Sequence, residues 1–293
     1  MKIISEKIEV LGTIVEIKLT QQKSYLVKNC FNEFKRIEEK YSRFKKNSLL
    51  SKANAKIGVW QKVDSEFIFL LKQALYFNNK TNGFFDVTIK KILENLGYDQ
   101  NYSLEPKIVV EKEIEGLEEP IIINEQTNEI LLHKEIDFGG LGKGYAIDLA
   151  SLILKKNLAE HYYINAGGDV FAKSKYGFEP WIVLLEHPDK EGFVIGKIEL
   201  NGKAIACSAP NKRKWLNYHH LINPKKKMPE KENKAVFVLA DSAIEADAYA
   251  TGLFCAGFEN AIEISKKLPI GILLISSENK IYKSKNFDVN FFE

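Results

Sequence analysis

Apolar and polar residues follow one strand pattern and two helical patterns in the first third of the chain. "VEIKL" at residues 15–19 alternates apolar and polar side chains, as a half-buried strand does. A helix is then predicted because apolar residues recur at steps of three and four, at Leu26, Val27, Cys30, Phe31, Phe34, Ile37 and Tyr41. A second helix is predicted over residues 67–75, after a cap at Asp64 or Ser65, and the glycine turn in "TNGFFD" ends it.

The second half of the chain alternates short strand-like runs with glycine turns. The runs are "EILLHKEIDF", "HYYINAGGD", "PWIVLLEH", "FVIGKIEL", "KAIACS", "KAVFVLAD" and "LPIGILLIS", and helices at about residues 143–157 and 242–256 interrupt them. Because strands and helices do not alternate regularly, we predict an α+β fold and not a doubly wound α/β sheet. We interpret residues 1–293 as one domain, with an exposed acidic connection or insertion at about residues 100–120.

Composition narrows the class of protein without indicating a charged partner. The 293 residues are 45% hydrophobic and 28% charged, which is typical of a soluble globular protein with a sizeable core. The net charge of +3 gives no general argument for nucleic acid or membrane binding, and we expect no nucleic acid partner. Three widely spaced cysteines, Cys30, Cys207 and Cys255, exclude a complete disulfide framework, so we expect reduced and buried thiols.

The sequence as it stands predicts neither a signal peptide nor a transmembrane segment. No run of 18 uncharged apolar residues occurs, which predicts no transmembrane segment. The N-terminal "MKIISEKIEV" lacks the apolar stretch of about 7 to 15 residues that a signal peptide carries. We therefore expect a cytoplasmic protein, or an exported one or a lipoprotein whose leader has been removed.

Four glycines surround a lysine in "IDFGGLGKGYAID" at residues 136–148. The pattern predicts a strand that ends at Phe138, a glycine turn, and a helix that begins near Lys143. Free backbone N–H groups at such a helix start suit a phosphate, although a turn packed tightly on a neighbouring strand explains the glycines equally well. The spacing matches neither the Walker loop nor the dinucleotide fingerprint.

Three further segments carry candidate chemistry. Gly167 and Gly168 in "INAGGDVF" either admit a ligand against bare backbone or form a hairpin turn. Asp247 and Thr251 lie four residues apart on a predicted helix, so their oxygens share a face that suits Mg²⁺, unless the threonine bonds back to the helix. His219 or His220 in "YHHLINP" is a candidate general base, although a surface pair is the alternative. The flanking basic runs are interpreted as solvated loops.

In their order these segments resemble the FAD:protein FMN transferase family, often called ApbE. The resemblance covers nearly the whole chain and rests on seven ordered matches: "LGTIVEIKL", "YSRFKKNSLLSKAN", "NGFFDVTI", "IDFGGLGKGYAID", "NAGGD", "HLINP" and "EADAYATGLF". It implies an ApbE-like, T-fold-related domain of mixed or antiparallel sheets flanked by helices. It also implies transfer of FMN from FAD to a threonine or serine of an acceptor protein, with Mg²⁺ at the pyrophosphate and release of AMP.

The resemblance also assigns roles to residues. It implies that Asp247, Thr251 and the backbone oxygen of Gly140 hold Mg²⁺, that His220 is the base, and that Lys143 holds FAD and stabilises charge during transfer. The remaining residues implied to border FAD are Leu11, Phe44, Phe84, Phe85, Asp86, Asp137, Gly139, Gly167, Gly168 and Ser208.

The chain departs from the family pattern at several positions. Leu11 replaces a usual Met, Ala209 a Gly, Asn223 an Asp, and Lys226 and Lys227 a Thr-Gly pair. Two alternatives therefore stay open. One is an FAD pyrophosphatase, in which water replaces the acceptor hydroxyl, and the other is a flavin-binding or carrier protein without transfer chemistry.

Overall fold

An antiparallel sheet of eight strands forms the centre of the molecule. The computed structural model describes residues 2–100, 102–107, 119–211 and 213–292. The strands are β1 (Ile3–Val10), β2 (Thr13–Thr20), β6 (Tyr162–Ala166), β7 (Asp169–Lys173), β10 (Lys203–Ser208), β15 (Asn233–Ala240), β16 (Gly271–Ser276) and β17 (Ile281–Lys283), in the spatial order β1-β2-β6-β7-β10-β15-β16-β17. All neighbouring pairs run antiparallel.

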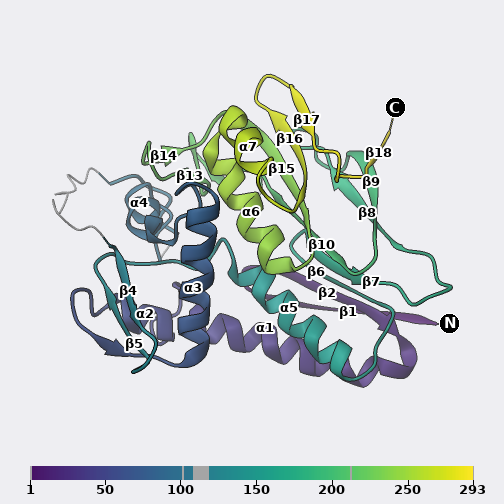
Figure 1. Ribbon diagram of the computed structural model, residues 1–293, viewed down its shortest axis with the longest axis horizontal. Coiled ribbons are helices and arrows are strands. Elements are labelled where there is room, and N and C mark those ends of the chain that lie inside the picture. The colour runs from purple at the N-terminus through teal and green to yellow at the C-terminus, as the bar shows by residue number, and fades with distance from the viewer. Residues whose placement is uncertain (1, 101, 108–118, 212, 293) are drawn as a thin grey trace.

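Helices cover one face of this sheet, as Figure 1 shows. They are α1 (Val27–Tyr41), α5 (Gly142–Lys156), α6 (Ala243–Ala256) and α7 (Phe258–Ser265). The buried residues of α1 recur at helical spacing, so one stripe of it faces the core. In α6, 12 of the 14 residues are buried because the helix contacts the sheet, α5 and α7 at once. Because α6 is packed on several sides, its few polar side chains are held in defined positions.

A smaller antiparallel sheet covers the other face. It contains β8 (Trp181–Glu186), β9 (Val194–Leu200) and β18 (Asn290–Phe291), in the order β18-β9-β8. Successive residues of the large sheet alternate between the two cores: Ile164 packs with the helices, and the adjacent Tyr163 packs with the small sheet. The central strands of the large sheet are therefore buried on both faces.

The remaining elements lie at one end of the large sheet and in its connections. Two helices and a three-stranded sheet form the end region seen at the left of Figure 1: α2 (Leu49–Asn54), α3 (Ser65–Lys80), β3 (Gln61–Lys62), β4 (Ile121–Asn124) and β5 (Glu129–Leu132). The short elements are η1 (Gln21–Leu26), η2 (Val87–Ile89), α4 (Lys90–Asn95), and the hairpins β11 (Lys214–Trp215) with β12 (Tyr218–His219) and β13 (Ile222–Asn223) with β14 (Met228–Pro229).

The predicted α+β class is confirmed, and so are the four predicted helices. Asp64 caps α3, because its side chain accepts a hydrogen bond from the Phe67 N–H at 2.9 Å. The predicted strand ending at Phe138 is wrong: β5 ends at Leu132. Asn54 bonds both backbone polar groups of Ile136, at 2.8 and 2.9 Å, so Ile136 has neither group left for pairing with a neighbouring strand.

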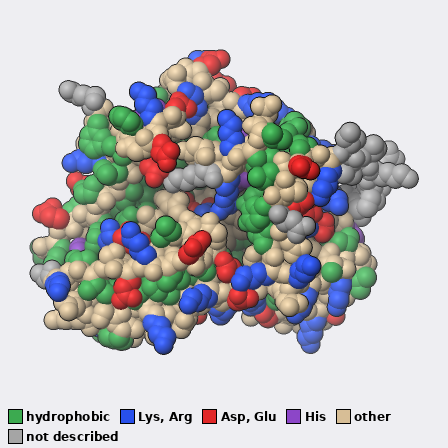
Figure 2. Space-filling model, turned by 180° about the vertical axis from the view of Figure 1, so that it is seen from behind, with side chains coloured by type: hydrophobic (Ala, Val, Ile, Leu, Met, Phe, Trp, Pro, Cys, Tyr) green, Lys and Arg blue, Asp and Glu red, His purple; other side chains and the backbone are tan. Residues whose placement is uncertain are grey.

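Two other predictions can be compared with the structure only over the residues that it describes. Most of the acidic segment at about residues 100–120 lies outside them, since residues 101 and 108–118 are not described. Across the ranges that the structure describes, no helix combines the length and the apolar character needed to cross a membrane. Figure 2 shows that acidic, basic and hydrophobic side chains are interspersed on the rear face.

Candidate active site

Two adjoining cavities open beside the glycine turn that precedes α5. The polar cavity is lined by Lys143, Asp169, Ser208, His220, Asp247 and Thr251, among others. The aromatic cavity, of about 570 Å³, is lined by Leu11, Arg43, Phe44, Tyr98, Tyr102 and Trp215, among others, and lies within the size range of small-molecule sites, about 300–1,000 Å³. Asp137, Gly139 and Lys143 line both cavities, so one extended ligand can contact both.

A lysine and two aspartates form an ion cluster in the wall of the polar cavity. The Nζ atom of Lys143 lies 2.8 Å from Oδ2 of Asp169 and 2.9 Å from Oδ1 of Asp247. The N–H of Gly144 donates to Oδ2 of Asp247 at 3.1 Å. Both aspartates are buried, and a buried carboxylate needs a cation or hydrogen-bond donors to offset its desolvation. The cluster therefore joins the start of α5 to α6 and to the first residue of β7.

Burial and ion pairing act in opposite directions on the cluster. Burial lowers the pKa of Lys143, but the charges of Asp169 and Asp247 outweigh it and raise the pKa above its ordinary value. Burial raises the pKa of Asp169, Lys143 opposes this rise, and the charge of Asp247 adds to it. Lys143 therefore stays protonated at neutral pH and places a positive charge against the cavity.

The face of α6 that carries Asp247 and Thr251 lies directly against the glycine turn. Both side chains line the polar cavity, as their spacing on one helical face requires. A methyl group built on Gly140 would lie 3.2 Å from Cγ2 and 3.4 Å from Oγ1 of Thr251. One carboxylate, one hydroxyl and the main chain of Gly140 thus meet here. Mg²⁺ takes hard oxygen donors of this kind, usually with only one or two carboxylates.

This donor set is sparse for an all-protein metal site. Among the residues with described positions, no group of three or more His, Cys, Asp or Glu side chains could hold a metal ion. The carboxylate of Asp247 is also bonded to Lys143. The residues fit a cation that keeps water or ligand phosphate oxygens in the rest of its coordination shell.

The two adjacent histidines have different environments. His219 is buried and its Nε2 atom donates to the carbonyl oxygen of Glu230 at 2.9 Å. His220 lines the polar cavity, with Nδ1 at 3.4 Å from the carbonyl oxygen of Arg213. Burial lowers the pKa of His220 to about 3, and the charge of Arg213 adds to this effect. His220 is therefore the histidine of the cavity, and it is neutral at physiological pH.

Most of the other residues predicted to border a ligand line one of these cavities. Phe85, Asp86, Asp137, Gly139, Gly140, Gly167 and Ser208 line the polar cavity, and Leu11 and Phe44 line the aromatic cavity. Phe84 lies elsewhere, with the ammonium of Lys225 at 4.1 Å from its ring centroid. Gly168 lines a third, largely apolar cavity between the two sheets. The structure brings neither Phe84 nor Gly168 to the two adjoining cavities.

The glycines of the two glycine-rich turns have different structural roles. Gly139 and Gly140 line the polar cavity, and Gly142 lines the aromatic cavity. Gly144 instead packs against α6, because a methyl group built on it would overlap the backbone of Ala243. The pair at residues 167–168 forms the hairpin turn between β6 and β7, with φ values of 65° and 105° that favour glycine.

Several lining residues had no signal in the sequence strong enough to single them out. Asp169 directly follows the glycine pair in "NAGGD", so the hairpin turn was visible but its ion pair with Lys143 was not. Arg43 lies in the matched segment "YSRFKKNSLLSKAN" but had no role assigned to it, and Tyr98 and Arg213 line the cavities from outside the matched segments. Only the tertiary fold brings these charges together.

Known proteins resemble this chain over most of its length. A family model described as "ApbE family" matches residues 11–274. A protein of Buchnera aphidicola named FAD:protein FMN transferase is 30% identical over 302 residues, which cover 97% of this chain and 88% of that protein. A protein of Escherichia coli K12 with the same name is 27% identical over 266 residues, covering 83% of this chain and 74% of that protein.

Solved structures show the same fold. The crystal structure of the ApbE protein from Thermotoga maritima superimposes with a TM-score of 0.88 at 28% identity, covering 97% of each chain. The flavin transferase ApbE from Vibrio cholerae superimposes with a TM-score of 0.82 over 98% of each chain, and its 24% identity supports the fold alone.

Proposed function

The chain belongs to the ApbE family, and on that premise we propose that it transfers the FMN half of FAD to a threonine or serine hydroxyl of an acceptor protein and releases AMP. The relatives named FAD:protein FMN transferase support a flavin transferase. The observation that carries the proposal for this chain is the approach of Asp247 and Thr251 to Gly140 and Lys143 in one cavity wall.

The two cavities suit the two chemical parts of FAD. In the polar cavity the ammonium of Lys143 can donate hydrogen bonds to the diphosphate, while the aromatic cavity offers rings for stacking. Because the cavities share Asp137, Gly139 and Lys143, the diphosphate can lie at the glycine turn while a ring system occupies the aromatic cavity.

Asp247, Thr251 and the backbone oxygen of Gly140 are the residues that would hold Mg²⁺. Bound Mg²⁺ would supply positive charge that neutralises the pyrophosphate oxygens. Lys143 supplies a second positive charge from the chain itself, and its ammonium donates hydrogen bonds to whichever anionic oxygens face it. Phosphoryl transfer depends mainly on such charge stabilisation and on alignment.

His220 has the protonation state that a base requires. A carbonyl oxygen can only accept, so a hydrogen bond between Nδ1 and the Arg213 carbonyl places the ring proton on Nδ1 and leaves the Nε2 lone pair free. The acceptor hydroxyl oxygen forms a bond to the FMN phosphorus, the bond from that phosphorus to the AMP oxygen breaks, and the hydroxyl proton passes to His220. The negative charge of a bound diphosphate would raise the pKa of His220 toward the working range.

One assay tests the proposal and separates it from its alternatives. The protein is mixed with FAD, Mg²⁺ and an acceptor that carries a Ser/Thr flavinylation segment, and fluorescence of the acceptor on a denaturing gel is measured together with free AMP. Labelled acceptor with AMP supports the transferase. AMP without label indicates a pyrophosphatase, and bound FAD without either product indicates a carrier.

A matched pair of variants tests the proposed metal residues. Asp247→Asn should abolish Mg²⁺-dependent AMP release, because it removes the carboxylate from the cavity wall. Asp241→Asn is the control, since the Asp241 side chain is 80% exposed beside the start of α6 and pairs with Lys203 in a surface contact. Unchanged Mg²⁺-dependent AMP release in Asp247→Asn would contradict the assignment.

A further inference from the structure

Arg43 is a buried cation at the junction of the glycine turn and the aromatic cavity. The residue is only 5% exposed. Its Nε atom lies 3.1 Å from Oδ2 of Asp137, and its Nη2 atom donates to the carbonyl oxygen of Tyr98 at 2.9 Å. These partners offset the cost of burying the guanidinium and hold it in one orientation.

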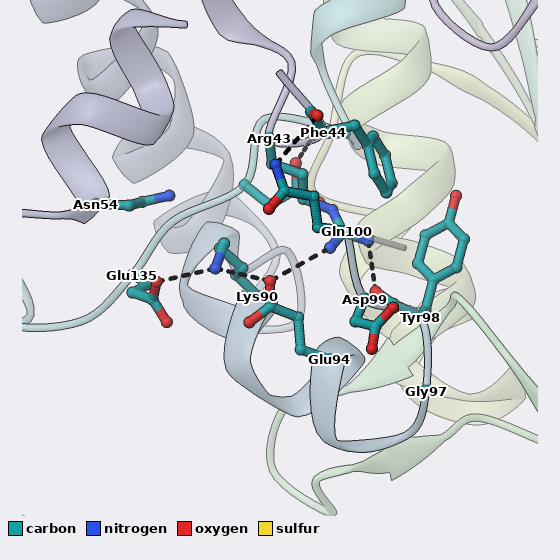
Figure 3. A network of polar contacts seen from close by, with 12 residues as sticks. Arg43, Phe44, Asn54, Lys90, Glu94, Gly97, Tyr98, Asp99, Gln100 and Glu135 are labelled. Atoms are coloured by element: carbon teal, nitrogen blue, oxygen red, sulfur yellow. Dashed lines mark hydrogen bonds and ion pairs between the residues drawn. The ribbon is translucent and has the colours of Figure 1, made fainter. Parts of the chain in front are cut away.

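Asp137 is the principal carboxylate partner of Arg43. Glu94 lies nearby, but its Oε1 atom is 3.9 Å from Nη1 of Arg43, too far for a hydrogen bond. Glu94 is already paired with Lys90, whose Nζ atom lies 2.8 Å from that same oxygen and 2.9 Å from Oε1 of Glu135 (Figure 3). Glu94 therefore has a cation of its own.

The guanidinium of Arg43 also contacts the wall of the aromatic cavity. Its central carbon lies 4.3 Å from the ring centroid of Phe44 and 4.7 Å from that of Tyr98, within the range of cation–π contacts. Phe44 in turn stacks on Tyr102, with centroids 4.7 Å apart and planes 10° from parallel. Arg43 thus contacts two of the aromatic rings that line this cavity.

Asp137 links Arg43 to the glycine turn. Its Oδ1 atom accepts a hydrogen bond from the N–H of Gly139 at 3.1 Å, while Oδ2 faces Arg43. The backbone on the other side is held independently, because Asp137 N–H donates to the carbonyl oxygen of Val87 at 2.8 Å and Asn54 bonds Ile136. The carboxylate of Asp137 is therefore the link through which Arg43 reaches Gly139.

We propose that Arg43 is a positioning residue for the dinucleotide: it fixes the glycine turn through Asp137 and the aromatic wall through Phe44 and Tyr98. The diphosphate and a ring of the same ligand are then held at a set separation. This inference rests on the proposed flavin transfer. Arginine suits the position because its planar group forms directed hydrogen bonds at its edge and stacks on rings with its faces, whereas lysine offers a single ammonium.

The test is a double-mutant cycle on FAD affinity, measured by calorimetric titration. Arg43→Lys and Asp137→Asn should each weaken FAD binding on the order of tenfold to a hundredfold, the scale expected for a displaced binding group. The double variant should bind FAD no more weakly than the single variant with the lower affinity, because both changes break the same link between Arg43 and Asp137. Arg36→Lys is the control: Arg36 pairs with Glu66 through two hydrogen bonds of 2.7 Å and lines neither cavity, so FAD affinity should not change.

Hydrogen exchange of residues 137–142 without FAD gives a second readout. Arg43→Lys should speed exchange there several-fold, and Arg36→Lys should not. Unchanged exchange in Arg43→Lys, or additive losses of FAD affinity in the double variant, would overturn the positioning role. Wild-type protein that binds no FAD would instead overturn the proposed function, while the exchange experiment still reports whether Arg43 holds the turn.

Discussion

Replacing Gly144 with alanine tests whether the contact between α5 and α6 builds the site. A methyl group at this position would lie 2.6 Å from the carbonyl carbon of Ala243 and 2.7 Å from Cα of Ile244. Ordinary carbon contacts are about 3.5–4.0 Å, so the helices must separate by about 1 Å. The atoms that are met belong to the backbone, and no side-chain rotation relieves the overlap. The change also displaces the Gly144 N–H from Asp247.

The cost follows from the interactions that such a separation disturbs. Overpacking of a tight contact costs about 1–3 kcal/mol. The hydrogen bond from Gly144 to the Asp247 carboxylate contributes about 1.5–3 kcal/mol. Alanine recovers at most about 1 kcal/mol by its higher helix propensity. We therefore expect Gly144→Ala to lower the free energy of unfolding by about 2–5 kcal/mol.

Gly142→Ala is the matched control two residues away. A methyl group built on Gly142 meets no atom within 4 Å, and Gly142 is not among the residues with positive φ. It should leave stability unchanged or raise it by about 0.4–1 kcal/mol. Denaturant unfolding monitored by circular dichroism measures both variants. The reasoning is refuted if Gly144→Ala unfolds at the wild-type denaturant concentration, or if both variants lose equal stability.

Three other predictions concern chemistry and pH. His220→Ala should keep FAD affinity and lose about a hundredfold to ten-thousandfold in the rate of acceptor labelling, and equal losses of both would make His220 a binding residue. Thr251→Val, which keeps the shape and removes the hydroxyl, should raise the Mg²⁺ concentration for half-maximal AMP release by about tenfold or more, and an unchanged value would remove Thr251 from the metal site. Burial tends to raise the pKa of Glu66, but hydrogen bonds from Arg36, Lys40 and Tyr145 outweigh it and lower the pKa to about 2. The stabilisation that the charged Glu66 contributes is present above the unfolded pKa of 4.5 and is lost as pH falls toward 2. Glu66→Gln should therefore lower the free energy of unfolding by up to about 3 kcal/mol at pH 7, and by progressively less below pH 4.5, as measured in urea titrations. A loss of stability that does not change with pH would contradict this.

The sequence predicted those elements whose own residues carry a periodic signal. The stripe of α1 and the apolar run of α6 were readable because each element buries its own pattern. The strand β1 was not predicted, because it is an edge strand whose residues are mostly exposed and so lack alternation. The segment before Phe138 was misread because Asn54, remote in sequence, takes the hydrogen bonds that a strand partner would have taken.

The candidate site was predictable only in part, for a similar reason. The shared face of Asp247 and Thr251 is a property of one helix, so spacing alone predicted it. That Lys143 lies between Asp169 and Asp247, or that Arg43 reaches Asp137, depends on distances between separate segments, which no local pattern encodes. The purpose of Gly144 was likewise hidden, because the atom that excludes a side chain belongs to Ala243.

The ion cluster explains how these separate segments form one site. Asp169 lies in the central sheet and Asp247 in the helix that covers it, and two buried carboxylates in one cavity wall would repel each other. Leaving either without a cation would cost several kcal/mol, which is a large share of the stability of a domain. Lys143 meets this need from the start of α5, and the absence of a side chain at Gly144 lets α5 approach closely enough for it to do so. In the proposed function, the same lysine that stabilises the packing of α5 would also provide the charge that faces the diphosphate of FAD, so the folding of this region and the binding of that diphosphate would depend on one contact.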